Sequence, residues 1–181
     1  MKGKLIVVSG PSGAGKSTVT KIARDKLNIP LTISATTRKP RQDETDGKDY
    51  YFLSEEEFMK KVEEDKFFEW AKVHDNYYGT LKSEVEKKRE DGNTVLLEID
   101  VQGGLTVKKK DPSAVLVFFK APNDKELEER LRNRGSDSEE VIQKRLENAL
   151  KEMEYEKDYD YSIINKSIDQ SFQELVDIIN Q

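Results

Sequence analysis

The residues from Gly10 to Ser17 have the types and spacing of a phosphate-binding loop. They read Gly-Pro-Ser-Gly-Ala-Gly-Lys-Ser, which fits the pattern G-x-x-x-x-G-K-[ST]. The apolar run 5–8 leads into this segment and a helix-compatible stretch follows it, which is the strand–loop–helix context that the motif needs. The glycines let backbone N–H groups approach phosphate oxygens, and the following helix directs its positive end toward the same anion. We expect Lys16 to reach the β- and γ-phosphates of a nucleotide and the Ser17 hydroxyl to bind Mg²⁺.

Two arginines around a proline turn, Arg38 and Arg41, indicate a second anion site. Guanidinium groups match the oxygens of phosphate, so this segment can clamp a dianionic monophosphate. The hydroxyls of Tyr50 and Tyr78 are candidate donors to the same phosphate. On these residues alone, a solvated basic loop and packed tyrosines remain alternatives to a phosphate clamp.

Two carboxylates end the apolar run 94–100, which predicts a buried parallel strand with acidic groups at its carboxyl edge. Glu98 and Asp100 are candidates to hold Mg²⁺ through water or to position the nucleotides. We favour Asp100 for the metal side and Glu98 for the acceptor side. The alternative is that one of the two simply faces solvent.

Composition narrows the class of protein. The 181 residues are enough for one compact domain with small inserted subdomains, and the formal net charge of -5 argues against binding to nucleic acid or to an anionic membrane. The absence of cysteine excludes disulfides and thiol catalysis, and His74 is the only histidine. No apolar stretch has the length of a membrane span, and the chain enters its first strand without a signal-peptide core. We therefore expect a cytoplasmic location.

Apolar runs alternate with helical patterns, which predicts an α/β fold: a parallel sheet with helices on both faces. The expected strands are 5–8, 31–34, 49–52, 67–74, 94–100, 114–119 and 161–164. The expected helices are 17–26, 54–64, 81–90, 101–110, two within 124–155, and 169–180, whereas residues 76–80 are expected to form a turn. Ser54 and Glu57 form a predicted capping box at the start of one helix.

Several further motifs accompany the phosphate loop. They are Thr36-Thr37-Arg38-Lys39-Pro40-Arg41-Gln42-Asp43-Glu44 with Gly47-Lys48-Asp49-Tyr50, Phe68-Glu69-Trp70, Tyr77-Tyr78-Gly79-Thr80, Leu97 to Gly103, Arg134-Gly135, and Arg145-Leu146. With them the sequence resembles guanylate kinases over essentially the whole chain. The resemblance implies an ATP:GMP phosphotransferase that uses Mg²⁺ and has a P-loop NTPase-type core. It also implies a GMP-binding insert at 32–80 and a helical lid at 123–156, around a core of 1–31, 81–122 and 157–181.

The resemblance also implies roles for individual residues. The catalytic residues would be Lys16, Arg38, Arg134 and Arg145, and the metal ligands Ser17 and Asp100. ATP would bind to Gly10, Pro11, Ser12, Gly13, Ala14, Gly15, Lys16, Ser17, Thr18, Arg130, Arg134 and Asn165. GMP would bind to Ser34, Arg38, Arg41, Tyr50, Glu69, Tyr78, Thr80, Glu98 and Asp100. The expected partners are ATP and GMP, with dGMP and the oligomeric state left open.

The guanine contacts have a chemical rationale. Guanine presents N1–H and N2–H₂ donors beside an O6 acceptor, so a carboxylate can accept from both donors while a hydroxyl donates to O6. The resemblance assigns the carboxylate to Glu69 and the supporting contacts to Ser34 and Thr80. A carboxylate on a strand face and two turn caps are the alternatives.

The sequence departs from the guanylate kinase pattern at two places. Asp75 stands where a glycine is usual, and Asn165-Lys166-Ser167 replaces an Asn-Asp pair, which puts the adenine contacts in doubt. Asn165-Lys166 is also similar to the N-K-x-D motif of GTPases, but Ile168 occupies the aspartate position. Two other functions remain as alternatives, a phosphate-loop kinase of another nucleoside monophosphate and a non-catalytic binding module.

Overall fold

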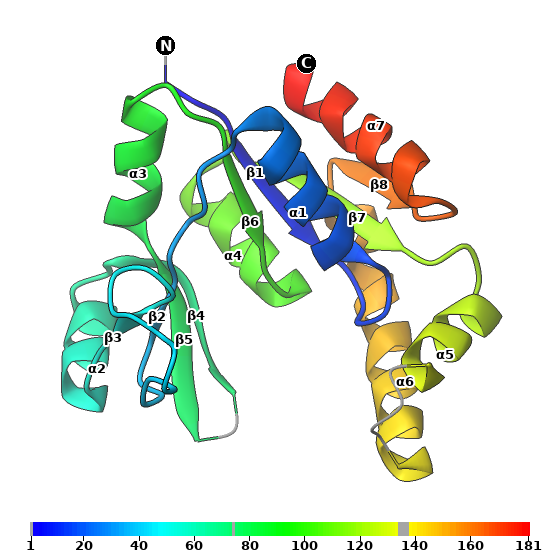
Figure 1. Ribbon diagram of the computed structural model, residues 1–181, viewed down its shortest axis with the longest axis horizontal. Helices are drawn as coiled ribbons and strands as arrows, with labels where there is room; N and C mark the ends of the chain where they lie inside the picture. The colour runs from blue at the N-terminus through cyan, green and yellow to red at the C-terminus, as the bar shows by residue number, and fades with distance from the viewer. Residues whose placement is uncertain (1, 74, 134–137) are drawn as a thin grey trace.

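The computed structural model describes residues 2–73, 75–133 and 138–181. Its central element is a four-stranded sheet in the order β6-β1-β7-β8, in which every neighbouring pair is parallel. The strands are β1 (Leu5–Ser9), β6 (Val95–Glu98), β7 (Val115–Lys120) and β8 (Tyr161–Ile164). Their carboxyl ends meet at one edge, which is where parallel α/β sheets place their ligands (Figure 1).

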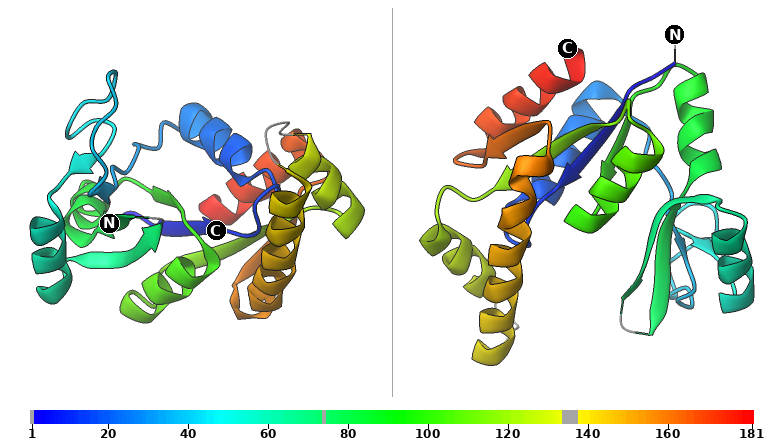
Figure 2. Two further views of the ribbon diagram at one scale, coloured as in Figure 1. Left: turned by 90° about the horizontal axis from the view of Figure 1, so that it is seen from below. Right: turned by 180° about the vertical axis from the view of Figure 1, so that it is seen from behind.

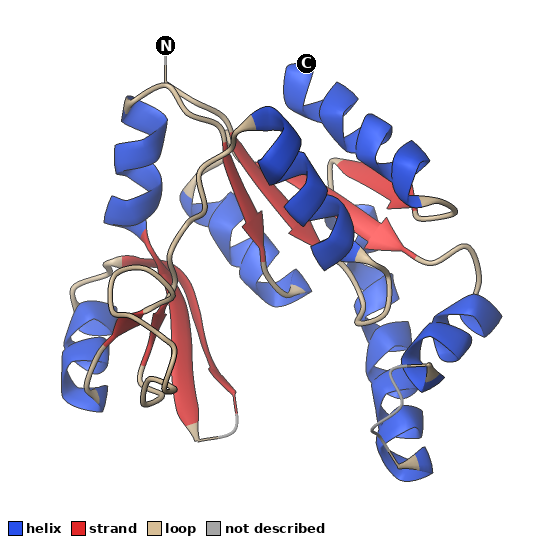
Figure 3. Ribbon diagram, viewed as in Figure 1, coloured by secondary structure: helices blue, strands red, loops and turns tan. Residues whose placement is uncertain are grey.

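Helices cover both faces of this sheet (Figure 3). Helices α1 (Lys16–Leu27) and α7 (Ile168–Asn180) pack on one face together with Ile6 and Val8. Helices α3 (Lys82–Glu90) and α4 (Val101–Lys110) pack on the other face together with Leu5 and Val7. Because both faces are covered, β1 is apolar at successive positions rather than at alternate ones. The predicted α/β fold is confirmed.

A second sheet has the strand order β3-β2-β5-β4. Its strands are β2 (Ala35–Thr36), β3 (Tyr51–Phe52), β4 (Phe67–Val73) and β5 (Asn76–Leu81), and helix α2 (Glu55–Glu63) accompanies them. Aromatic stacking joins the helix to the sheet, since the Phe58 ring lies 4.5 Å from that of Phe67 and 5.5 Å from that of Tyr77. The predicted capping box at Ser54 and Glu57 is present.

A helical pair follows β7. It consists of α5 (Asp124–Arg132) and α6 (Glu139–Met153), which continues into a short 3₁₀ helix, η1 (Glu154–Asp158). Leu127, Leu131 and Ala149 form the apolar contact between α5 and α6. Figure 2 shows that the second sheet and the helical pair lie at opposite ends of the molecule. Among the described helices, none is long and apolar enough to cross a membrane.

Two sequence expectations were wrong at the level of elements. Residues 31–34 are not a strand, because the backbone N–H of Ile33 donates to the Glu84 carboxylate rather than to a ladder partner. Residues 76–80 are not a turn but most of β5, which pairs with β4 on one side and β2 on the other. The glycine signal there has another cause, since a Cβ on Gly79 would lie 2.8 Å from the Phe67 ring.

Candidate active site

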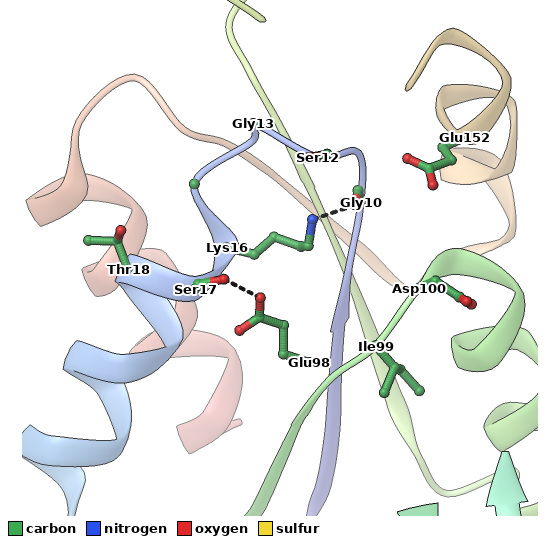
Figure 4. A pocket seen from close by; sticks show the side chains of 11 residues that line it. Gly10, Ser12, Gly13, Lys16, Ser17, Thr18, Glu98, Ile99, Asp100 and Glu152 are labelled. Atoms are coloured by element: carbon green, nitrogen blue, oxygen red, sulfur yellow. Dashed lines mark hydrogen bonds between the residues drawn. The ribbon is translucent and has the colours of Figure 1, made fainter. Parts of the chain in front are cut away.

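The phosphate loop borders a cavity of about 410 Å³ at the carboxyl end of β1 (Figure 4). Loop residues Gly10, Ser12, Gly13 and Gly15 line it together with the first residues of α1. From the other side it is lined by Glu98, Ile99 and Asp100, which follow one another at the end of β6, and by Glu152 of α6. Backbone N–H groups at a helix N-terminus and a lysine thus lie at one open, polar cavity, which suits a polyphosphate.

Two glycines are required by the path of the loop. Gly10 has a φ of 138°, and a Cβ there would lie 2.0 Å from the carbonyl oxygen of Phe119. Gly15 has a φ of 86°, and a Cβ there would lie 2.2 Å from the side-chain nitrogen of Asn165. Any larger residue would therefore displace the loop from β7 or from the segment after β8.

Lys16 begins α1 and folds back over the loop. Its Nζ donates to the carbonyl oxygens of Gly10 at 2.5 Å and Pro11 at 2.9 Å. These contacts hold the ammonium group above the loop, at the cavity where phosphate charge would lie (Figure 4).

Glu98 and Asp100 have different environments. Ser17 Oγ donates to Glu98 Oε1 at 2.5 Å, and Thr20 Oγ1 donates to Glu98 Oε2 at 2.9 Å. Asp100 is exposed and accepts the Gly103 N–H at 2.6 Å as the N-cap of α4. The structure therefore places Glu98 against the predicted metal ligand Ser17, while its predicted service to the acceptor side stays a prediction.

Ser17, Glu98 and Asp100 are the kinds of side chain with which phosphate-transfer sites usually bind Mg²⁺. Among the described residues, no group of three or more acidic or histidine side chains could hold a metal ion by itself. Mg²⁺ is typically bound by one or two carboxylates together with water and nucleotide phosphates rather than by a full protein cage. One hydroxyl and two carboxylates at the phosphate cavity fit that pattern.

Glu152 extends from α6 toward the same cavity (Figure 4). Burial raises its pKa; the positive charge of Lys16 opposes this and the negative charge of Asp100 adds to it. It was not among the sequence candidates, because α6 carries many glutamates and only the packing of that helix shows which one faces the cavity.

The predicted second anion site lies beside the second sheet. Two threonines place it there: Thr36 Oγ1 donates to the carbonyl of Tyr77 at 2.9 Å, and the N–H of Tyr77 donates to Thr37 Oγ1 at 2.9 Å. These two hydrogen bonds join the residues before Arg38 to the residue before Tyr78. The two predicted phosphate ligands therefore come together although they are forty residues apart.

Arg38 is surrounded by aromatic rings and a carboxylate. Its guanidinium carbon lies 5.5 Å from the ring centre of Tyr50 and 5.9 Å from that of Phe52. Its Nη2 donates to Glu44 Oε1 at 2.7 Å. This bond is the main cause that raises the pKa of Arg38, and a bond with Tyr78 contributes. Arg38, Tyr50 and Tyr78 are thus assembled at one place, while the side chain of Arg41 is exposed beside them.

The candidate guanine reader, Glu69, lies on β4 opposite Thr80 of β5. Thr80 Oγ1 donates to Glu69 Oε1 at 2.6 Å, and burial raises the pKa of Glu69. A Cβ on Gly103 would lie 3.3 Å from Glu69 Oε2 and 3.2 Å from Asp100 Oδ1, so both carboxylates border the start of α4. Ser34 and Thr80 also line a smaller cavity of about 190 Å³ with Glu98.

Asn165 connects three elements behind the phosphate loop. Its buried side chain donates to the Ala14 carbonyl at 2.8 Å and accepts from Ser171 Oγ of α7 at 2.9 Å. The main-chain carbonyl of Asn165 accepts from Arg130 Nη2 of α5 at 2.9 Å. Arg145 is half-buried on α6, and Arg134 lies outside the described residues.

Comparison with known proteins decides the family. A family model described as guanylate kinase matches residues 2–181. The chain belongs to the guanylate kinase family. It is 61% identical to a guanylate kinase of Fusobacterium nucleatum over 98% of this chain and 96% of the relative, and 51% identical to one of Caldanaerobacter subterraneus over 98% and 87%. A crystal structure of guanylate kinase from Anaplasma phagocytophilum superposes with a TM-score of 0.74 at 31% identity, over 99% of this chain and 85% of that one.

The guanylate kinase motifs within the described residues thus lie at the phosphate loop and the end of β6, on the second sheet, and, for Arg145-Leu146, on α6. The roles predicted for their residues stay predictions, as do the boundaries of insert and lid. Two polar residues at these sites were missing from the sequence candidates: Glu152, which carries no sequence signal, and Glu44, which stands within the motif that follows Arg38.

Proposed function

We propose that this protein transfers the γ-phosphoryl group of ATP to GMP, giving ADP and GDP. Membership of the guanylate kinase family supports this, because relatives of that name share 46–61% of its residues over nearly the whole chain. The observation that carries the proposal is the pairing of a phosphate-loop cavity with a separate arginine–tyrosine clamp in one molecule. A kinase needs one site for a polyphosphate donor and another for a monophosphate acceptor.

On the donor side, the ATP phosphates would lie on the loop backbone, with Lys16 against the β- and γ-phosphates. Ser17, Glu98 and Asp100 are the groups that would hold Mg²⁺, directly or through water. The bound ion would neutralise the negative charge of the phosphates during transfer. Glu98 belongs in this set because its carboxylate already contacts the Ser17 hydroxyl.

On the acceptor side, the phosphate of GMP would bind to Arg38, Arg41, Tyr50 and Tyr78. Glu69 would accept the N1–H and N2–H₂ donors of guanine, with Ser34 and Thr80 near the base. The raised pKa of Glu69 suits a buried carboxylate that receives its missing donors from the substrate.

No protein nucleophile is required, because a GMP phosphate oxygen attacks the γ-phosphorus directly. The protein aligns the two phosphates in line and stabilises the charge that develops during transfer. Lys16 does this from the loop, and Arg145 and Arg134 would do it from the helical pair. Exclusion of water would protect ATP from hydrolysis.

The test is a panel of nucleoside monophosphates incubated with ATP and Mg²⁺, with ADP release as the readout. The expected result is a strong preference for GMP. Including dGMP in the panel measures whether the deoxynucleotide is also an acceptor. Preference for AMP, UMP or CMP would indicate a kinase of a different monophosphate. Binding of GMP without ADP release would indicate a non-catalytic module.

A further inference from the structure

We propose that Glu44 is a positioning residue for the acceptor phosphate: it holds Arg38 in its binding orientation before GMP arrives. The inference rests on the proposed function, since it concerns the phosphate clamp of the acceptor site. Glu44 would not touch the substrate itself. It would act through the guanidinium group that does.

The carboxylate of Glu44 is fixed by its own turn. Its Oε2 accepts the backbone N–H of Arg41 at 2.8 Å, and its backbone N–H donates to the Arg41 carbonyl at 3.1 Å. These reciprocal bonds close the segment 41–44 on itself. The position of the carboxylate is therefore set by main-chain contacts and not by Arg38.

The other oxygen holds Arg38. Glu44 Oε1 accepts from Arg38 Nη2 at 2.7 Å, while Arg38 Nη1 donates to the Lys39 carbonyl at 2.8 Å. Both side chains of the ion pair are only 18% exposed. The guanidinium carbon lies 5.5 Å from the ring centre of Tyr50 and 5.9 Å from that of Phe52. Because a guanidinium carries five N–H groups, these two contacts leave others for phosphate oxygens.

Because Glu44 stays ionised, its ion pair with Arg38 persists over the whole neutral pH range. The bond with Arg38 and the Arg41 N–H lower the pKa of Glu44 to about 2. The carboxylate is therefore ionised throughout the neutral range, and the ion pair does not switch on and off. A long flexible arginine thereby loses its conformational freedom before the substrate binds, which favours affinity.

A competing interpretation predicts the opposite change in the KM for GMP when Glu44 is removed. A carboxylate beside Arg38 could act as a rival to phosphate, so that GMP must displace it. The fixed turn argues against displacement, because Glu44 Oε2 accepts from the main-chain N–H of Arg41 and this bond does not depend on the Arg38 guanidinium. Removing a rival would lower the KM for GMP, whereas removing a support would raise it.

The experiment compares Glu44→Ala and Glu44→Gln with the wild-type chain. We expect Glu44→Ala to raise the KM for GMP at least about tenfold, with the KM for ATP within about twofold. Glu44→Gln keeps one acceptor oxygen, which can serve Arg38 or the Arg41 N–H but not both, so its KM for GMP should lie between those of Glu44→Ala and the wild type. Calorimetry with guanosine, which lacks the phosphate, should show no difference between wild type and either variant.

Asp49→Ala is the matched control, because the Asp49 carboxylate also stabilises this loop by accepting the Thr45 N–H at 2.8 Å. We expect it to leave the KM for GMP near the wild-type value. An unchanged or lowered KM in Glu44→Ala would overturn the inference, as would an equal rise in Asp49→Ala or an equal loss of guanosine binding. A wild-type protein that does not phosphorylate GMP would instead refute the proposed function.

Discussion

At the scale of single residues, the two sites depend on charges held in defined hydrogen bonds. Lys16 is held over the loop by two carbonyl oxygens, and Glu69 is held by the Thr80 hydroxyl at 2.6 Å. A lysine whose ammonium group lies at a polar cavity contributes little to the hydrophobic core. Its replacement should therefore affect chemistry much more than folding.

We expect Lys16→Met to lower kcat by about a hundredfold or more, because a lost phosphate contact costs about 3 kcal/mol in the barrier. The melting temperature should stay close to that of the wild type. Lys21→Met is the control, since Lys21 is on the same helix, its side chain is 74% exposed and it pairs with Asp25. Steady-state kinetics and thermal unfolding of both variants make the comparison; undiminished turnover in Lys16→Met would refute the loop assignment.

Glu69 predicts a pH dependence of GMP binding. Burial raises its pKa, with Thr80 and Lys110 opposing the shift and Asp100 adding to it, so this carboxyl keeps its proton to a higher pH than a free glutamate does. The protonated carboxyl stabilises the folded protein fully at pH values below the pKa that Glu69 has in the unfolded chain. This contribution is lost as the pH rises through the higher pKa of the folded protein. The donors of guanine need the ionised form. We therefore expect affinity for GMP to fall as pH decreases through the raised pKa of Glu69.

The measurement is calorimetry of GMP binding between about pH 5 and pH 7 for wild type and Glu69→Gln. The phosphate of GMP itself titrates near pH 6, so the difference between the two proteins is the quantity that reports Glu69. Glu69→Gln should also lose much of the preference for GMP over AMP. Identical pH profiles would show that Glu69 is only a carboxylate on a strand face.

At the scale of elements, the phosphate loop is supported from behind rather than by itself. Asn165 follows β8 and joins the Ala14 carbonyl to the Ser171 hydroxyl of α7, and its own carbonyl receives Arg130 from α5. The side chain and the main-chain carbonyl of Asn165 therefore connect the phosphate loop, α7 and α5. A loop that must present its N–H groups to phosphate without reorganisation benefits from such a support.

We expect Asn165→Ala to lower the free energy of unfolding by about 2 kcal/mol, because two buried polar groups lose their partner. In a chain of this size that corresponds to a fall of about 4–8 °C in melting temperature. The KM for ATP should rise more than the KM for GMP, since the loop is the element that is released. Ser171→Ala removes only the α7 contact, so it should lower stability while leaving the KM for ATP near wild type; equal kinetic effects would contradict the loop role.

At the scale of the whole molecule, donor and acceptor groups come from different parts. The loop belongs to the core sheet, the clamp to the second sheet, and Arg145 to the helical pair at the opposite end (Figure 2). In-line transfer brings the reacting atoms to about 3–3.5 Å. Phosphates that bind to all three parts would draw them together, because the positive groups gain a shared counter-charge only when both nucleotides are present.

We expect small-angle scattering to show a smaller radius of gyration with an ATP–GMP bisubstrate analogue than without ligand. The connection 31–34 is a natural hinge, since it lies outside any helix or strand and its Ile33 N–H contacts a side chain rather than a ladder strand. ATP alone and GMP alone should give intermediate values. A radius that is the same in all four states would argue against closure.

The sequence by itself was enough to predict the phosphate loop, the capping box at Ser54, the parallel sheet and the family. These features are carried by residues close together in the chain: a motif of eight residues, a Ser-x-x-Glu cap, and apolar runs that indicate burial on both faces. Only the tertiary structure decided that 76–80 is a strand, because its pairing partners lie in β2 and β4. It also decided that Glu98 meets Ser17, that Glu152 faces the cavity and that Asn165 supports Ala14. Each of these contacts joins residues far apart in sequence, and their distance depends on how whole elements pack, which no local pattern encodes.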